Sequence, residues 1–378
     1  MIRIAPSTLN IAAKSARRHG FGFQCSFFRS QSTSLSSMRS RKFSAVVQEP
    51  VAEQQHAPFD KIAFIGSGRM AEAMVAPIVN TGLQPASKIT IFDVHQSTMD
   101  RVAETYSVNS SQSIEECVAD AELICLAVKP QNCDVVFKSI RDVHEQGLTH
   151  DRATLLSIIA GMPMKSYTAT GIDRIARSMP NTPATIGEGM TVWSATDNIC
   201  DKTKDKIADV LSSFGKAIYV DDEKFIDMST SISGSGPAYI FMLMEAMIDA
   251  GVHLGFSREM ATTLTHHTLL GSTLYAMETK DHPAILRNNV TSPAGTTASA
   301  IYELEDGKFR TVVKNAIWAC YRRALEMGGE DSNVGPGRTA PVVVQQTFYK
   351  APKGEMFIET GDIKRQSIRV SGKPIGRK

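Results

Sequence analysis

The sequence has few cysteines, no long apolar run and no acidic residue before Glu49. Apart from Cys25, near the start, five cysteines remain, an odd number without a C-x-x-C pair. This pattern predicts neither a disulfide framework nor a metal site. The longest candidate for a membrane span, Ala238–Met244, is stopped by Glu245, far short of the roughly 18 apolar residues that a span needs. We therefore expect no membrane partner.

The first 48 residues carry eight basic side chains and many serines but no acid. This composition is typical of an organelle transit peptide, which we expect over residues 1–44. The run from Arg41 to Ser44 resembles a mitochondrial cleavage site, so a mitochondrial location is favoured and a plastid is the alternative. A basic tail that stays attached is the other interpretation. Residues 45–58 are interpreted as a linker.

The rest of the chain is acidic and ordinary in composition. Without the first 48 residues, 33 basic residues face 39 acidic ones, a formal charge of −6. This part of the chain therefore lacks the net positive charge that is typical of nucleic-acid-binding proteins. Hydrophobic residues make up 42% and charged residues 21% of the 378, which is typical of a globular enzyme of about two domains.

Short apolar runs alternate with amphipathic stretches between residues 59 and 221. The expected strands are Ile62–Ile65, Ile89–Phe92, Leu123–Val128 and Thr154–Ile159, and the first expected helices are Met70–Asn80 and one near Ser97–Tyr106. This alternation predicts right-handed βαβ units and a doubly wound parallel sheet of the Rossmann type. The strands are continuously apolar, which favours burial on both faces. Cys125 is expected to be a buried strand residue.

The strand pattern stops after about Asp222. Long helical patterns follow at Gly236–Leu254, Ser257–Met277 and Lys308–Met327. The first of them is apolar nearly all round, so it needs burial on every side. We expect a second, all-helical domain over residues 222–328 that packs against another copy of itself, in a homodimer or a higher homo-oligomer. Residues 329–378 form a C-terminal extension without a functional interpretation.

A glycine-rich loop follows the first expected strand and opens the first helix. It contains Gly66, Ser67, Gly68, Arg69 and Met70, followed by Ala71. The G-x-G-x-x-A pattern at this junction predicts a dinucleotide pyrophosphate site at the helix N-terminus, so NADPH or NADH is the expected cofactor. The alternative is a tight turn that binds no ligand.

Asp93 closes the second expected strand. A carboxylate there can accept hydrogen bonds from both ribose hydroxyls and repels a 2′-phosphate, which favours NADH. Arg69 is a cation near the same loop and can serve either the pyrophosphate or a 2′-phosphate. A helix-capping role for Asp93 is the alternative.

Several motifs together resemble pyrroline-5-carboxylate reductase. They are Ile65–Ala71, Ala127–Pro130, Met179–Pro183, Ser233–Tyr239 and Val290–Thr297, in order between about Asp60 and Met327. The resemblance implies a Rossmann domain, a helical domain that interlocks with a partner subunit, and an active site partly shared across the dimer. It implies hydride transfer from NAD(P)H to the C=N carbon of 1-pyrroline-5-carboxylate, which gives L-proline in the final step of proline biosynthesis.

The resemblance also assigns residues. Ser292, Gly295, Thr296 and Thr297 would bind the substrate carboxylate at a helix start, where free N–H groups favour an anion. Thr297 resembles the family threonine whose hydroxyl lies close to the substrate nitrogen, which makes it the candidate catalytic residue. A simple capping box is the alternative for this segment. The cofactor set extends to Ala127, Val128, Lys129, Pro130 and Asn181.

One residue departs from the family pattern within the substrate segment. The family usually reads Ser-Pro-Gly-Gly where this chain has Ser292-Pro293-Ala294-Gly295. Ala294 should fit unless its φ is positive.

Three other functions compete with this one. A β-hydroxyacid dehydrogenase would use a lysine on the long helix, and Gly236–Gly255 contains none. Another imine-reducing Rossmann enzyme is the second. A non-catalytic nucleotide-binding protein is the third, although the Ser292–Thr297 segment is intact apart from Ala294.

Overall fold

A computed structural model describes residues 57–337, 349–350 and 356–357. The predicted transit peptide, almost all of the predicted linker and most of the C-terminal extension lie outside the described residues. None of the helices in the described part of the chain combines the length and the hydrophobicity of a transmembrane span.

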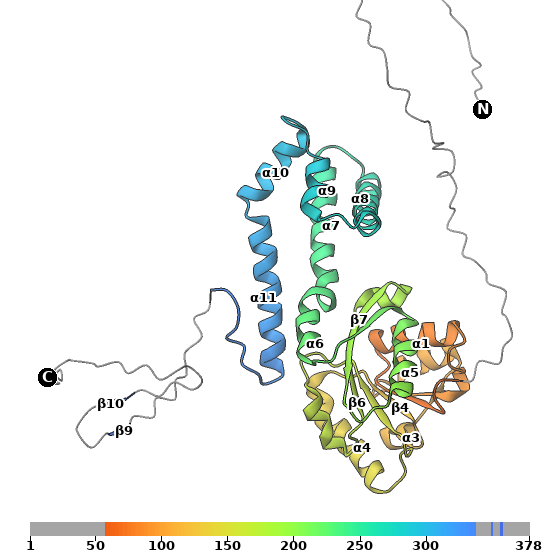
Figure 1. Ribbon diagram of the computed structural model, residues 1–378. Coiled ribbons are helices and arrows are strands. Elements are labelled where there is room, and N and C mark those ends of the chain that lie inside the picture. Colours follow the sequence, from red (N-terminus) through yellow and green to blue (C-terminus); the bar gives the residue numbers. More distant parts are fainter. Residues whose placement is uncertain (1–56, 338–348, 351–355, 358–378) are drawn as a thin grey trace, which may run out of the picture. The chain divides into compact units, whose positions relative to one another are not determined.

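The first part of the described chain forms an eight-stranded sheet in the order β3-β2-β1-β4-β5-β6-β7-β8. Figure 1 shows this sheet with helices beside it. The strands are β1 (Ile62–Ile65), β2 (Ile89–Phe92), β3 (Asn109–Ser110), β4 (Leu123–Leu126), β5 (Thr154–Ser157), β6 (Ile175–Met179), β7 (Gly189–Ala195) and β8 (Gly215–Tyr219). All neighbouring strands are parallel except β6 and β7. The predicted Rossmann-type fold is confirmed, with one antiparallel pair that the sequence pattern did not predict. The short connection through η5 (Thr182–Ile186) is the reason, because parallel strands need a longer crossover.

The helices between the strands cover both faces of this sheet. They are α1 (Arg69–Asn80), α2 (Gln96–Tyr106), α3 (Ile114–Val118), α4 (Cys133–Glu145) and α5 (Asp201–Ser212), with short turns η2 (Ala86–Lys88), η3 (Pro130–Asn132) and η4 (Met164–Thr170). On β1, Ile62 and Phe64 pack in one core with α1 and α5, whereas Ala63 and Ile65 pack in a second core with α3 and α4. Successive strand side chains point to opposite faces, so a strand between two helical layers is apolar throughout. Cys125 is 1% exposed, as expected for such a strand.

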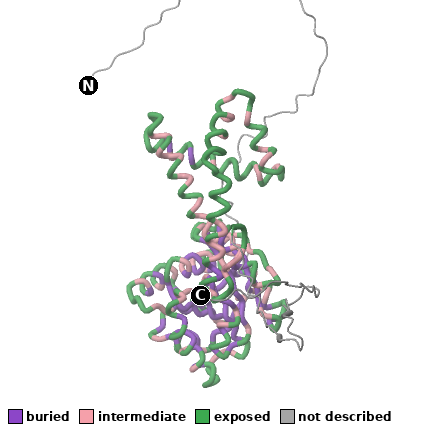
Figure 2. The backbone as a smooth tube through the Cα atoms, turned by 90° about the vertical axis from the view of Figure 1, so that its left-hand side faces the viewer, coloured by how far each residue is buried: buried purple, intermediate pink, exposed green. Residues whose placement is uncertain are grey.

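Helices alone follow β8, up to residue 327. They are α6 (Lys224–Ser229), the π-helical turn η6 (Thr230–Gly234), α7 (Gly236–His253), α8 (Arg258–Thr279), α9 (Pro283–Asn289), α10 (Thr296–Asp306) and α11 (Phe309–Met327). Figure 2 shows that buried positions gather around the sheet, whereas these helices are mostly exposed. Helix α7 has no buried residue in the single chain, and Phe241 and Met242 are 59% and 72% exposed. An apolar helix that is uncovered in one chain needs cover from another.

Two short strands belong to the C-terminal extension. β9 (Tyr349–Lys350) pairs antiparallel with β10 (Met356–Phe357).

Candidate cofactor and substrate site

The glycine-rich loop turns directly from β1 into α1. Gly66 donates its N–H to Phe92 O at 2.7 Å and has a φ of +97°. A Cβ at this position would lie 2.6 Å from Ala127 O, so the conformation and the packing both require glycine. Gly68 is the N-cap of α1 and makes no side-chain cap. The free N–H groups at this helix start are therefore available to an anion such as a pyrophosphate.

A cavity of about 490 Å³ lies at the carboxyl ends of the strands beside this loop. The predicted cofactor residues that line it are Gly66, Gly68, Asp93, Ala127, Val128 and Lys129. The predicted residues that do not line it are Ser67, Arg69, Met70, Pro130 and Asn181. In parallel sheets of this kind, ligands bind at the carboxyl edge, so the cavity has the place and the size for a nucleotide.

The carboxylate of Asp93 is bound to the loop it faces. It accepts hydrogen bonds from Ser67 N at 2.7 Å and Ser67 Oγ at 3.2 Å on one oxygen, and from His95 N at 2.9 Å on the other. Burial alone would raise the pKa of Asp93, but these hydrogen bonds outweigh it and hold the pKa below its ordinary value. Asp93 therefore presents a negative charge to the cavity and also holds the loop to the end of β2.

Sequence reasoning missed the apolar walls of the cavity. Val94 and Val135 both line it and are 77% and 69% exposed. Two exposed valines around one cavity suit a flat aromatic ring such as a base, because covering them removes apolar surface from water. Their positions in the sequence could have indicated this role. Val94 directly follows Asp93, which closes the second strand, and Val135 lies in the first turn of α4.

Asn181 uses its side chain within the protein. Its Nδ2 donates to Ser233 O at 3.0 Å, and its Oδ1 accepts from Met190 N at 2.9 Å. The side chain thus ties the end of β6 to η6 and to β7. The predicted contact of Asn181 with the cofactor stays a prediction.

The predicted substrate segment leads from α9 into α10. The N-cap of α10 is Gly295, and no side chain caps the helix. Among the residues that the structure describes, the hydroxyls of Ser292, Thr296 and Thr297 have no hydrogen-bond partner. A Cβ at Gly295 would collide with Ser292 Oγ. The side chains therefore do not form the alternative capping box, and the helix N–H groups and hydroxyls are free for a ligand.

Ala294 does not meet the condition under which it was expected to fit. Its φ is +55°, in the left-handed region where the family's glycine carries no penalty. A residue with a Cβ costs about 1–2 kcal/mol there. The strain lies within the predicted substrate segment, next to the glycine that begins α10.

The cofactor cavity and the substrate segment are separate in one chain. None of Ser292, Gly295, Thr296 and Thr297 lines the cavity. Within the described residues, no hydrogen bond joins this segment to the sheet or to the loops at its edge.

Comparisons with known proteins give a consistent result. Residues 223–327 match the family described as pyrroline-5-carboxylate reductase dimerisation, and residues 61–151 match the family described as NADP oxidoreductase, coenzyme F420-dependent. The pyrroline-5-carboxylate reductases of Arabidopsis thaliana and Pseudomonas aeruginosa are each 37% identical over 269 residues. These alignments cover 71% of this chain, with 95% of the first relative and 96% of the second.

Solved structures of two relatives share the fold. The pyrroline-5-carboxylate reductase of Coxiella burnetii has a TM-score of 0.64 at 32% identity. The pyrroline carboxylate reductase of Plasmodium falciparum, solved with NADP bound, has a TM-score of 0.64 at 29% identity. Each comparison covers 71% of this chain and 98% of the relative.

Proposed function

The chain belongs to the pyrroline-5-carboxylate reductase family, and we propose that it reduces 1-pyrroline-5-carboxylate to L-proline with NADPH or NADH. This reaction is the final step of proline biosynthesis. The observation that carries the proposal is that the alignment spans nearly the whole length of reductases with this activity in their names. The two family matches, over residues 61–151 and 223–327, contain the cofactor loop and the substrate segment. The chain thus keeps the regions that the two reacting molecules require.

The residues present fit a nicotinamide dinucleotide. The loop at Gly66 and Gly68 would bring backbone N–H groups to the pyrophosphate, Asp93 would face the adenosine ribose, and Val94 and Val135 would cover the adenine. When bound, the reduced cofactor supplies the hydride. Lys129 lines the same cavity and would border the cofactor's ribose.

The substrate segment binds the other reactant. The free N–H groups at the start of α10, with Ser292 and Thr296, hold the carboxylate of the substrate. Thr297 places its hydroxyl at the imine nitrogen. That nitrogen is basic and can arrive protonated, so the reaction needs no strong general acid.

The site is completed by a second subunit. The cofactor cavity lacks the substrate segment of its own chain, and the dimerisation helices expose apolar side chains. We place the Ser292–Thr297 segment of one protomer beside the cofactor of its partner, in a homodimer or a larger homo-oligomer. Burial of the exposed apolar surface of α7 supplies the free energy of association.

The domain limits proposed are those predicted from the sequence: transit peptide 1–44, linker 45–58, dinucleotide-binding domain 59–221, helical domain 222–328 and C-terminal extension 329–378. The end of β8 at Tyr219 and the start of α6 at Lys224 support the central boundary. Import into mitochondria, with plastids as the alternative, rests on the acid-free basic segment. A full-length fusion tagged at its C-terminus tests this, and a cytosolic signal contradicts it.

The test of activity is the loss of NADPH or NADH absorbance in the presence of 1-pyrroline-5-carboxylate, with L-proline identified as the product. Hydroxy acids with the oxidised cofactor are the control for a hydroxyacid dehydrogenase. Cofactor binding without turnover of any of these substrates would contradict the proposal and favour a non-catalytic nucleotide-binding protein.

A further inference from the structure

Arg177 on β6 carries a fully buried charge that has no part in the cofactor cavity. Its side chain is 2% exposed. One terminal nitrogen donates to Glu223 Oε1 at 2.7 Å and to Asp227 Oδ2 at 3.1 Å, and the other donates to Asp227 Oδ1 at 2.6 Å. We name these three residues the junction cluster. The two oxygens of Asp227 engage the guanidinium as a fork, which fixes direction as well as distance, and Glu223 shares one of its nitrogens.

The junction cluster joins three parts of the chain. Arg177 comes from the sheet, Asp227 from α6, and Glu223 from the residue before α6. Glu223 Oε1 also accepts the N–H of Met164, in the segment that follows β5, at 2.7 Å. A buried ion cluster adds little net stability compared with apolar packing. Its bidentate contact, however, adds geometric specificity. Here it connects β6 and the segment after β5 to the first helix of the helical part.

The chain beyond Asp227 stays against the same edge of the sheet. η6 follows α6 directly, and a Cβ at Gly234 would lie 2.9 Å from Met179 Cε at the end of β6. The Asn181 side chain donates to Ser233 O, as described above. The π-helical turn therefore has two attachments of its own to β6 and its continuation, and the junction cluster adds a third, charged attachment through α6. π-helical turns within α-helices occur frequently at functional sites.

We infer that the junction cluster is a positioning device: it holds the Ser233–Tyr239 segment, at the start of α7, in register with the sheet edge where hydride transfer takes place. This inference rests on the proposed function. None of the three residues lines the cofactor cavity, so their loss should leave cofactor affinity intact. Turnover should fall, because a displacement of about 1 Å in a reacting geometry can cost about 100-fold.

Asp227→Asn is the sharpest perturbation. The amide keeps one oxygen for Arg177 but turns its NH₂ group toward a guanidinium nitrogen, where only donors would then face each other. The fork is lost while the size of the side chain is kept. We expect kcat with 1-pyrroline-5-carboxylate to fall about 10- to 100-fold, with the Kd for NADPH changed less than twofold.

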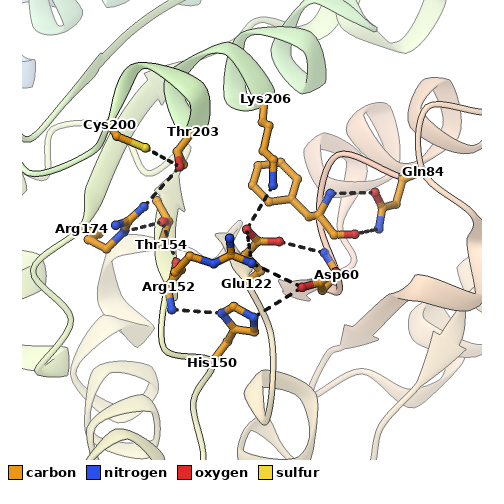
Figure 3. Close-up of polar contacts among 11 residues, drawn as sticks. Asp60, Gln84, Glu122, His150, Arg152, Thr154, Arg174, Cys200, Thr203 and Lys206 are labelled. Atoms are coloured by element: carbon orange, nitrogen blue, oxygen red, sulfur yellow. Dashed lines mark hydrogen bonds and ion pairs between the residues drawn. The ribbon is translucent and has the colours of Figure 1, made fainter. Parts of the chain in front are cut away.

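Glu122 provides a matched control at the amino ends of the strands. Figure 3 shows the polar contacts around it. Its buried carboxylate, directly before β4, accepts from Asp60 N at 2.9 Å and Lys206 Nζ at 3.1 Å, and Arg152 lies 3.6 Å away. Glu122→Gln is therefore the same change from carboxylate to amide. It is made on another buried, ion-paired side chain, at the amino ends of the strands. We expect it to lower thermal stability but to leave kcat within twofold of wild type.

The experiment compares wild type, Asp227→Asn and Glu122→Gln as full-length proteins of equal oligomeric state. Steady-state kinetics give kcat and KM, cofactor fluorescence gives the Kd, and hydrogen exchange reports on residues 230–239 without any turnover. Faster exchange there and a lower kcat in Asp227→Asn alone support the inference. A kcat within twofold of wild type in Asp227→Asn, or an equal loss in Glu122→Gln, overturns it. Inactive wild-type protein would instead contradict the proposed function, and the exchange comparison would still test the positioning.

Two further variants keep the test decisive if Asp227→Asn fails to fold. Glu223→Gln changes the more exposed carboxylate of the cluster and should give a smaller loss of kcat with the same unchanged Kd. Arg177→Lys keeps the charge but cannot form the fork, so it should not restore the geometry. Wild-type turnover in either variant would overturn the inference.

Discussion

Replacement of Asp93 by asparagine should change which cofactor the enzyme prefers. The carboxylate lines the cavity and is ionised well above its lowered pKa, so a 2′-phosphate bound beside it meets a like charge. In a partly desolvated site such repulsion is worth roughly 1–3 kcal/mol, about 5- to 160-fold in affinity. Asp93→Asn removes the charge and keeps an oxygen that can accept the Ser67 N–H. The ratio of NADPH to NADH affinity should rise by that factor.

The experiment must distinguish the effect of the Asp93 charge from the effect of its hydrogen bonds to the glycine-rich loop. Asp93→Ser also removes the charge, but its shorter side chain gives up the contact with Ser67 N, and a lost hydrogen bond of this kind costs about 1 kcal/mol. We therefore expect Asp93→Ser to improve NADPH use relative to NADH while it weakens the binding of both. Asp134→Asn, on an exposed carboxylate of α4 that does not line the cavity, is the control and should leave the ratio unchanged.

The assay is titration of each cofactor by its fluorescence, followed by kcat/KM with saturating 1-pyrroline-5-carboxylate. An unchanged ratio in Asp93→Asn would refute the reasoning. A wild-type enzyme that strongly prefers NADPH would do the same and would show that Arg69 or the loop after β2 governs the choice. Equal losses for both cofactors would mean that Asp93 acts only as the support of the glycine-rich loop.

Three other predictions concern the loop and the substrate segment. Thr297→Val and Thr297→Ala should lower kcat and kcat/KM together by about 10- to 100-fold, the pattern of an interaction made mainly in the transition state. Ser292→Ala should instead mostly raise KM. Wild-type kcat in a folded Thr297→Val enzyme would contradict the role of Thr297. Ala294→Gly should raise the free energy of unfolding measured in urea, because it relieves about 1–2 kcal/mol of left-handed backbone strain. The greater entropy of glycine in the unfolded chain offsets about 0.4–1 kcal/mol of this gain. A lower free energy of unfolding would show that no strain is held there. Gly66→Ala should abolish measurable cofactor binding in protein that still folds, because its Cβ would lie 2.6 Å from Ala127 O; unchanged NADPH titration would refute this.

The sequence by itself determined the elements whose information is local. The boundaries of β1 and β2 match the apolar runs residue for residue, and α7 and α11 lie within one residue of their predicted ends. The glycine-rich loop was equally predictable, since only glycine adopts the φ of Gly66 without strain. Family motifs added the substrate segment, whose hydroxyls the structure leaves without partners in the chain it describes.

Tertiary structure decided what depends on distant residues. β6 was missed because it contains Arg177, whose burial is possible only beside Asp227, 50 residues further along the chain. The positive φ of Ala294 follows from how α9 turns into α10, and the residue type alanine does not predict it. The exposed valines around the cavity come from separate elements, Val94 from the end of β2 and Val135 from the first turn of α4. Hydrophobic periodicity shows which face of an element is apolar. Which charged side chains pair, and where a cavity forms, depends on packing between elements, which the local pattern does not encode.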